Sequence, residues 1–84
     1  MSKNNINYAY DRDKNILIRH RVGSNGFIHE VRSYYDKKWI IVPNKENKYE
    51  EYARAIFLGQ GAWDRMESIT NEEAYRIMRM WGIK

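Results

Sequence analysis

Cysteine is absent from the 84-residue sequence, and proline occurs only once. The lack of cysteine excludes disulfide frameworks, cysteine–zinc sites and thiol catalysis, and it is typical of an intracellular protein. Long apolar runs are also absent, because a run of four residues such as 39–42, which none exceeds, is far too short to cross a membrane. The first five residues lack the apolar segment of a signal peptide. We therefore expect a cytoplasmic protein without a membrane partner.

The chain is short enough to form one domain only, spanning residues 1–84, with residues 1–5 as a disordered tail. Its hydrophobic fraction of 43% and aromatic fraction of 14% are sufficient for a packed core. The net charge of +4 arises in residues 1–44, which hold eight basic and four acidic side chains, whereas the remainder holds seven of each. This asymmetry favours contact with a polyanion, although a charge of this size is also common as solubility charge.

Alternating apolar and polar residues, interrupted by turn sequences, predict β-strands in the first half of the chain. The segment Gly23–Gly26 is the strongest turn signal, because its glycines and Asn25 can adopt positive φ in a tight hairpin. Further turns are expected at residues 11–15 and 36–38, and Pro43 ends the last strand. The predicted strands cover residues 6–10, 16–22, 27–35 and 39–42.

The hairpin around this turn has two possible registers, which keep the same two faces because they differ by an even shift. Pairing Val22 with Phe27 places His20 opposite His29. The alternative register has a two-residue loop one step further along the chain. In both registers one face is mostly apolar, and we predict that it forms the core. Its residues are Ile16, Ile18, His20, Val22, Phe27, His29 and Val31.

The opposite face of the hairpin is basic and is predicted to be solvated. Glu30 dilutes its charge, lying opposite Arg19 in the first register and opposite Arg21 in the second. Arginine and aromatic side chains of this kind anchor protein interfaces, and they can also follow a phosphate backbone or stack on bases. The candidate binding face consists of Leu17, Arg19, Arg21, Ile28, Arg32, Tyr34, Lys37, Lys38 and Trp39.

The second half of the chain has the apolar spacing of helices. A first helix is predicted over residues 45–58, with Asn44 as its cap and glycines at its end. Residues 54–58 are also short and apolar enough for a fifth strand, and this alternative stays open.

The last helix is predicted over residues 71–81. Thr70 and Glu73 have the spacing of a capping box, and Gly82 stands where a left-handed residue ends a helix. Ile83 could close that end by contact. The inner stripe of this helix is formed by Ala74, Ile77, Met78 and Trp81.

The facing of three aromatic residues depends on details that the sequence leaves open. We place Tyr8 and Tyr10 inward because they form the only apolar side of the first strand, whereas Trp39 faces the core or the basic face according to the length of the preceding loop. The predicted fold is α+β. It comprises a three- to four-stranded antiparallel meander over residues 6–42, followed by one or two helices, at 45–58 and 71–81, packed on one face.

No spacing in the sequence is typical of a catalytic or metal site. His20 and His29 are the only histidines, and metal sites usually need three or four ligands, so we interpret the pair as structural. Residues 11–13 are interpreted as a turn, and Gly59–Gly61 lacks the lysine of a phosphate-binding loop. We therefore expect no enzyme activity, no cofactor and no metal ion.

The composition is rich in asparagine, lysine and isoleucine, which indicates an AT-rich bacterial or phage genome. We expect a small non-catalytic binding or regulatory module of phage or mobile-element type that acts on a protein partner. The alternative is a nucleic-acid-binding domain that uses the basic sheet face. The identity of the partner, the oligomeric state and the pathway stay open.

Overall fold

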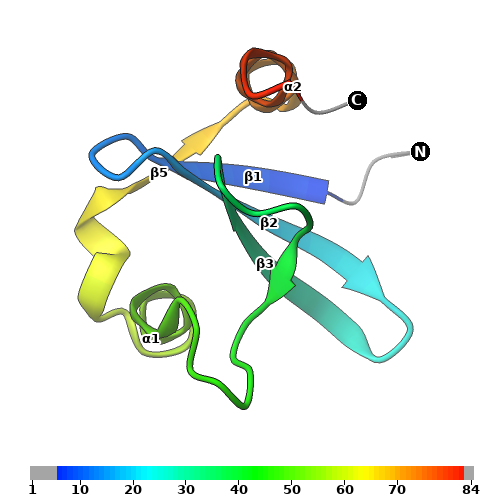
Figure 1. Ribbon diagram of the computed structural model, residues 1–84. Coiled ribbons are helices and arrows are strands. Elements are labelled where there is room, and N and C mark those ends of the chain that lie inside the picture. Colours follow the sequence, from blue (N-terminus) through cyan, green and yellow to red (C-terminus); the bar gives the residue numbers. More distant parts are fainter. Residues whose placement is uncertain (1–5, 83–84) are drawn as a thin grey trace.

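The computed structural model describes residues 6–82 and shows one five-stranded antiparallel sheet with a helix on each side (Figure 1). The strand order is β4-β3-β2-β1-β5, so the predicted α+β class and the meander β1–β2–β3 are confirmed. The tail predicted at residues 1–5 lies outside the described residues, as does Ile83. The elements are β1 (Ile6–Asp11), β2 (Ile16–Gly23), β3 (Gly26–Ser33), β4 (Ile40–Ile41), α1 (Glu50–Leu58), the 3-10 helix η1 (Gly61–Arg65), β5 (Met66–Ile69) and α2 (Asn71–Met80).

The β2–β3 hairpin adopts the first of the two predicted registers. Val22 pairs with Phe27 and Gly23 with Gly26, which leaves a two-residue loop between them. Gly26 has a φ of 119°, a backbone conformation that side chains rarely allow. The local turn chemistry therefore fixes the register of the longest strand pair.

The sheet has one strand more than predicted, and that strand is β5. It runs antiparallel to β1, with Tyr8 paired to Ile69 and Asp11 to Met66. The two central residues of β5 are the exposed, polar Glu67 and Ser68, so the segment carries no strong strand pattern of its own. Pairing with the open edge of β1 makes it a strand.

The prediction that the helices share one face is wrong, because α1 and α2 lie on opposite sides of the sheet (Figure 1). Ile18 and Val31 pack with α1, whereas Tyr8 and Leu17 pack with α2. Both faces of the sheet carry apolar residues, so each needs a cover. After α1 the chain reaches the far edge of the sheet through β5 and continues into α2 on the other face.

Helix α1 begins at Glu50, later than predicted. The side chain of Asn44 does not cap it, because its Oδ1 accepts hydrogen bonds from the backbone N–H groups of Glu46 and Lys48 and shapes a loop instead. The alternative of a fifth strand at the end of this segment is wrong, since the residues are helical up to Leu58. Gly59 then ends the helix with a φ of 67°.

Helix α2 follows the prediction closely. The Thr70 hydroxyl accepts a hydrogen bond from the Glu73 N–H, and the Glu73 carboxylate accepts one from the Thr70 N–H, so the capping box is present. Gly82 has a φ of 83°, as expected after the last turn. The predicted stripe faces the sheet, with Ala74 buried and its companions half-buried. No helix within residues 6–82 is long and apolar enough to cross a membrane.

The aromatic residues whose facing was open belong to this second core under α2. Tyr8 is buried and Tyr10 half-buried, which confirms that both point inward, although they do so on the face opposite to Ile18. Trp39 is half-buried on the same face, with its ring centroid 6.3 Å from that of Tyr8. A short second layer thus covers the part of the sheet that the sequence analysis treated as solvated.

Candidate interaction surface

The predicted basic face is partly closed by packing and ion pairing. Leu17 is fully buried, so it forms no part of a surface. Glu30, only 5% exposed, accepts hydrogen bonds at Oε1 from the Nε atoms of Arg19 and Arg21, both at 2.8 Å. Burial alone would raise the Glu30 pKa, but the hydrogen bonds from the two arginines outweigh it and hold the pKa below its ordinary value. Two of the predicted phosphate-binding cations therefore share one carboxylate, which compensates half of their charge.

Other residues of the predicted face are also engaged within the fold. The Arg19 guanidinium lies 4.2 Å from the centre of the Trp39 ring, a cation–π contact that holds both side chains against the sheet. Arg32 donates to the backbone carbonyl of Asp36 at 3.2 Å. The exposed ring of Tyr34 packs edge-on against Trp81.

Of the remaining members, Ile28 continues the face beside Arg21, its cross-strand partner, whereas the two lysines belong to a loop. Ile28 is half-exposed near the tip of the hairpin, whereas Lys37 and Lys38 are exposed in the loop before β4. The structure therefore divides the predicted set into a packed group around Trp39 and Glu30 and an exposed basic loop.

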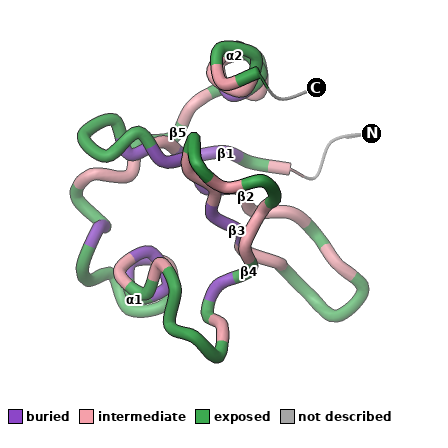
Figure 2. Tube along the Cα trace, viewed as in Figure 1, coloured by how far each residue is buried: buried purple, intermediate pink, exposed green. Residues whose placement is uncertain are grey.

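Exposed apolar side chains also lie on the other face of the sheet, which was predicted to form the core. Val22 is 50% exposed and Phe27 64%, so the prediction that both are core residues is wrong. The reason is the shortness of α1, which covers the middle of the face and leaves the end of the hairpin open (Figure 2). Phe57, near the end of α1, is 57% exposed and points toward this open part through a ring contact with His29.

We call this area the aromatic–histidine surface, defined by His20, Val22, Phe27, His29 and Phe57. The two imidazoles face each other across the strands with their Nδ1 atoms 2.8 Å apart, so the N–H of one ring donates a hydrogen bond to the Nδ1 of the other. The Phe57 ring stands edge-on to His29 at a centroid distance of 5.1 Å, and Phe27 stacks on His29 at 6.4 Å. The aromatic rings are therefore held in place by one another.

Both histidines favour their neutral form. Burial lowers the pKa of His20, and the neighbouring His29 lowers it further, while burial alone lowers the pKa of His29. No described carboxylate counteracts this shift at either ring. The surface therefore presents an uncharged imidazole pair framed by exposed apolar side chains near neutral pH.

We expect the free energy of unfolding, measured in EDTA, to fall as the pH drops below the ordinary histidine value of 6.5. The unfolded chain binds more protons than the native one in this range, so stability rises with pH until the unfolded histidines are neutral. The slope stays below about 1.4 kcal/mol per pH unit per ring, because each imidazole takes up at most one proton on unfolding. Urea denaturation between about pH 5 and pH 8 measures it.

The double variant His20→Gln/His29→Gln is the control for this slope. The carboxylates Asp11 and Glu30 titrate below the range, since their pKa values are lowered, so they leave it undisturbed. A slope that persists in the double variant would show that other groups cause it.

A second cluster, around Asp11, serves the fold. Its Oδ2 accepts hydrogen bonds from the Tyr52 hydroxyl at 2.5 Å and from Arg65 Nε at 3.0 Å, and Arg65 also binds Glu51 at 2.7 Å. Burial, together with the carboxylate beside it, raises the Tyr52 pKa well above its ordinary value. Within residues 6–82 every buried polar side-chain atom has a partner, so this network holds no group in reserve for a ligand.

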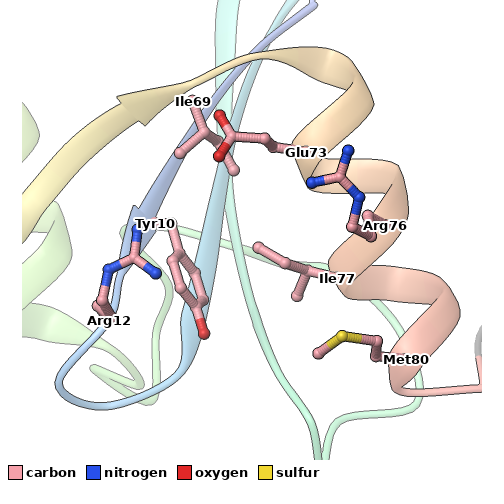
Figure 3. A pocket seen from close by; sticks show the side chains of 7 residues that line it. All are labelled: Tyr10, Arg12, Ile69, Glu73, Arg76, Ile77 and Met80. Atoms are coloured by element: carbon pink, nitrogen blue, oxygen red, sulfur yellow. The ribbon is translucent and has the colours of Figure 1, made fainter.

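A shallow pocket lies between β1, β5 and α2 (Figure 3). Its volume is about 190 Å³, less than the roughly 300–1,000 Å³ of ordinary ligand pockets. Arg12 at its edge is paired with Glu67, and Tyr10 donates to Asn15. We therefore do not assign a ligand to this pocket, which is lined by Tyr10, Arg12, Ile69, Glu73, Arg76, Ile77 and Met80.

Comparison with known proteins finds no matching family model, no similar curated protein and no similar solved structure. The function is therefore inferred from the residues of this chain.

Proposed function

We propose that this protein is a small non-catalytic binding module of phage or mobile-element type that docks on a protein partner through the aromatic–histidine surface. The observation that carries the proposal is the gathering of three large apolar side chains, Val22, Phe27 and Phe57, each at least half exposed, around one histidine pair. The next residue of α1, Leu58, adds to the exposed apolar area at 63%. Exposed apolar side chains scattered singly are ordinary, whereas a contiguous group is typical of an interaction site.

The contacts inside the surface suit it to binding. Phe27 and Phe57 both contact His29, so their rings lose less freedom on docking than isolated side chains would. The imidazole pair is neutral near physiological pH, so little charge has to be desolvated. Protein interfaces have aromatic, charge-poor centres of this kind.

Substitution of Phe27 or Phe57 by aspartate is expected to abolish binding of the protein partner. A buried carboxylate at the centre of an apolar contact costs several kcal/mol, enough to reduce capture by about tenfold or more. The measurement is affinity capture from a nuclease-treated lysate of the host, followed by quantification of each captured protein. Circular dichroism should show folded variants, because both side chains are exposed.

The matched control is Met80→Asp, which introduces the same charge at an exposed apolar residue on α2. It should leave capture unchanged. The proposal would be contradicted if the captured proteins bound equally to the wild type and to both phenylalanine variants. It would also be contradicted if nuclease treatment removed every captured protein.

A second candidate function is nucleic-acid binding, favoured by the exposed loop between β3 and β4. Lys37 and Lys38 form no ion pair with a described residue, and Tyr35 beside them is 87% exposed. Binding to DNA and RNA oligonucleotides across a salt series should then weaken steeply with salt. In the variant Lys37→Ala/Lys38→Ala, the slope of log affinity against log salt concentration should become smaller by about two. Absence of binding at low salt would exclude nucleic-acid binding as a function.

A further inference from the structure

We propose that His20 and His29 form half of a divalent transition-metal site, and that a second copy of the chain supplies the other half across the aromatic–histidine surface. This inference rests on the proposed function, because it uses the same surface and names the partner. The metal class is zinc or a similar borderline ion, which imidazole nitrogens bind well.

The two imidazole rings are close enough to bind one metal ion together. Their Nδ1 atoms face each other 2.8 Å apart on neighbouring strands, so the two nitrogens are already close enough to share one ion. Two imidazole nitrogens on a tetrahedral zinc ion are separated by about 3.4 Å, given bond lengths of about 2.0–2.1 Å. To bind zinc, the two Nδ1 atoms must move about 0.6 Å further apart, which small side-chain rotations can achieve. The hydrogen bond between the rings is replaced by two bonds to the metal.

One chain has too few ligands to complete a zinc site. The sequence has two histidines and no cysteine, and no described group of three or more potential ligands exists. A structural zinc ion usually has four protein ligands, so one chain provides only half of a site. A twofold interface places the same patch of both copies face to face, and two histidine pairs then give four ligands.

Exposed apolar side chains surround the histidine pair. Val22 and Phe27 are the next pair toward the hairpin turn and are exposed, and Phe57 contacts His29 from α1. In a twofold dimer these side chains bury against their copies and exclude water from the metal.

Sedimentation of the purified full chain during titration with zinc chloride tests the inference. The mass should rise from 10.2 kDa to twice that value, with one zinc ion per two chains. His20→Gln and His29→Gln should each abolish the zinc-dependent dimer. Phe27→Asp keeps both ligands and should also abolish it, whereas Met80→Asp should dimerise like the wild type.

Several results would overturn the inference. The chain could stay monomeric when zinc is added, or it could bind one zinc ion per chain as a monomer. Alternatively, the dimer could form without metal, or it could persist in both histidine variants. The proposed function fails separately: if zinc has no effect but Phe27→Asp still loses a partner from lysate in EDTA, only the metal-bridged dimer is wrong. If neither response is seen, both proposals are wrong.

Discussion

Replacement of Asp11 by alanine is expected to lower the free energy of unfolding by about 3–5 kcal/mol, a large part of the roughly 5–10 kcal/mol available to a domain of this size. Asp11 is fully buried, and its carboxylate accepts hydrogen bonds from Tyr52, Arg65 and the backbone N–H of Lys14. Alanine leaves the Tyr52 hydroxyl and one edge of the guanidinium without a partner, and unpaired buried groups are costly. Chemical denaturation followed by circular dichroism measures the loss.

Two further variants separate the contributions. Tyr52→Phe removes one hydroxyl and one hydrogen bond, so it should cost only about 1–2 kcal/mol. Asp13→Ala changes an exposed carboxylate two residues away and should stay within about 0.5 kcal/mol of the wild type. An Asp11→Ala protein as stable as the Asp13→Ala control would show that the network contributes little.

The elements that the sequence predicted correctly depend on signals between near neighbours. The β2–β3 hairpin follows from its turn at Gly23–Gly26, where two registers were open, and α2 follows from the capping box of Thr70 and Glu73. In both cases the residues that decide the conformation are at most three positions apart. Backbone conformation and local hydrogen bonding are then sufficient.

The features that the sequence did not reveal depend on partners far along the chain. Strand β5 exists because Ile69 pairs with Tyr8, and Asp11 is buried because Tyr52 and Arg65 reach it from later elements. Such contacts have no periodic signature of their own. The polar segment between Met66 and Ile69 gave no reason to expect a strand, and Asp11 was assigned to a turn.

The candidate site was misplaced for a related reason. Strand alternation correctly separated the two faces of the hairpin, and of the two registers left open the structure adopts the one that pairs His20 with His29. It could not show how much of each face the helices cover. The nine-residue helix α1 leaves Val22 and Phe27 open, while α2 closes the other face over Leu17. The apolar face is therefore the more exposed one at its outer end.

Arg21 shows the same limit on a smaller scale. The pairing of Arg19 with Glu30 follows from the register, and the structure confirms it. Arg21 reaches the same carboxylate diagonally, at 2.8 Å and 3.3 Å, because a glutamate between two strands has room for more than one guanidinium. Charge counting along the sequence treated Arg21 as available for a ligand, whereas the structure shows it occupied.

Leu17→Ala is expected to lower the free energy of unfolding by about 2–5 kcal/mol, because it leaves a cavity between the sheet and α2. Leu17 is completely buried in the cluster that includes Tyr8 and Ala74. If it lay on a solvated binding face, as the sequence suggested, the same substitution would change stability by about 0.5 kcal/mol or less. The two interpretations therefore differ by several times the error of a denaturation measurement.

Ile28→Ala provides the matched control, because Ile28 lies on the same face and is only half-buried near the hairpin tip. Its loss should be clearly smaller than that of Leu17→Ala, since fewer apolar contacts and less cavity are created. Equal, small losses at both positions would contradict the packing of α2 on the sheet and would restore the whole face as a surface. A large loss at Leu17 alone would confirm that α2 covers this part of the sheet, so that Leu17 is not available to a partner.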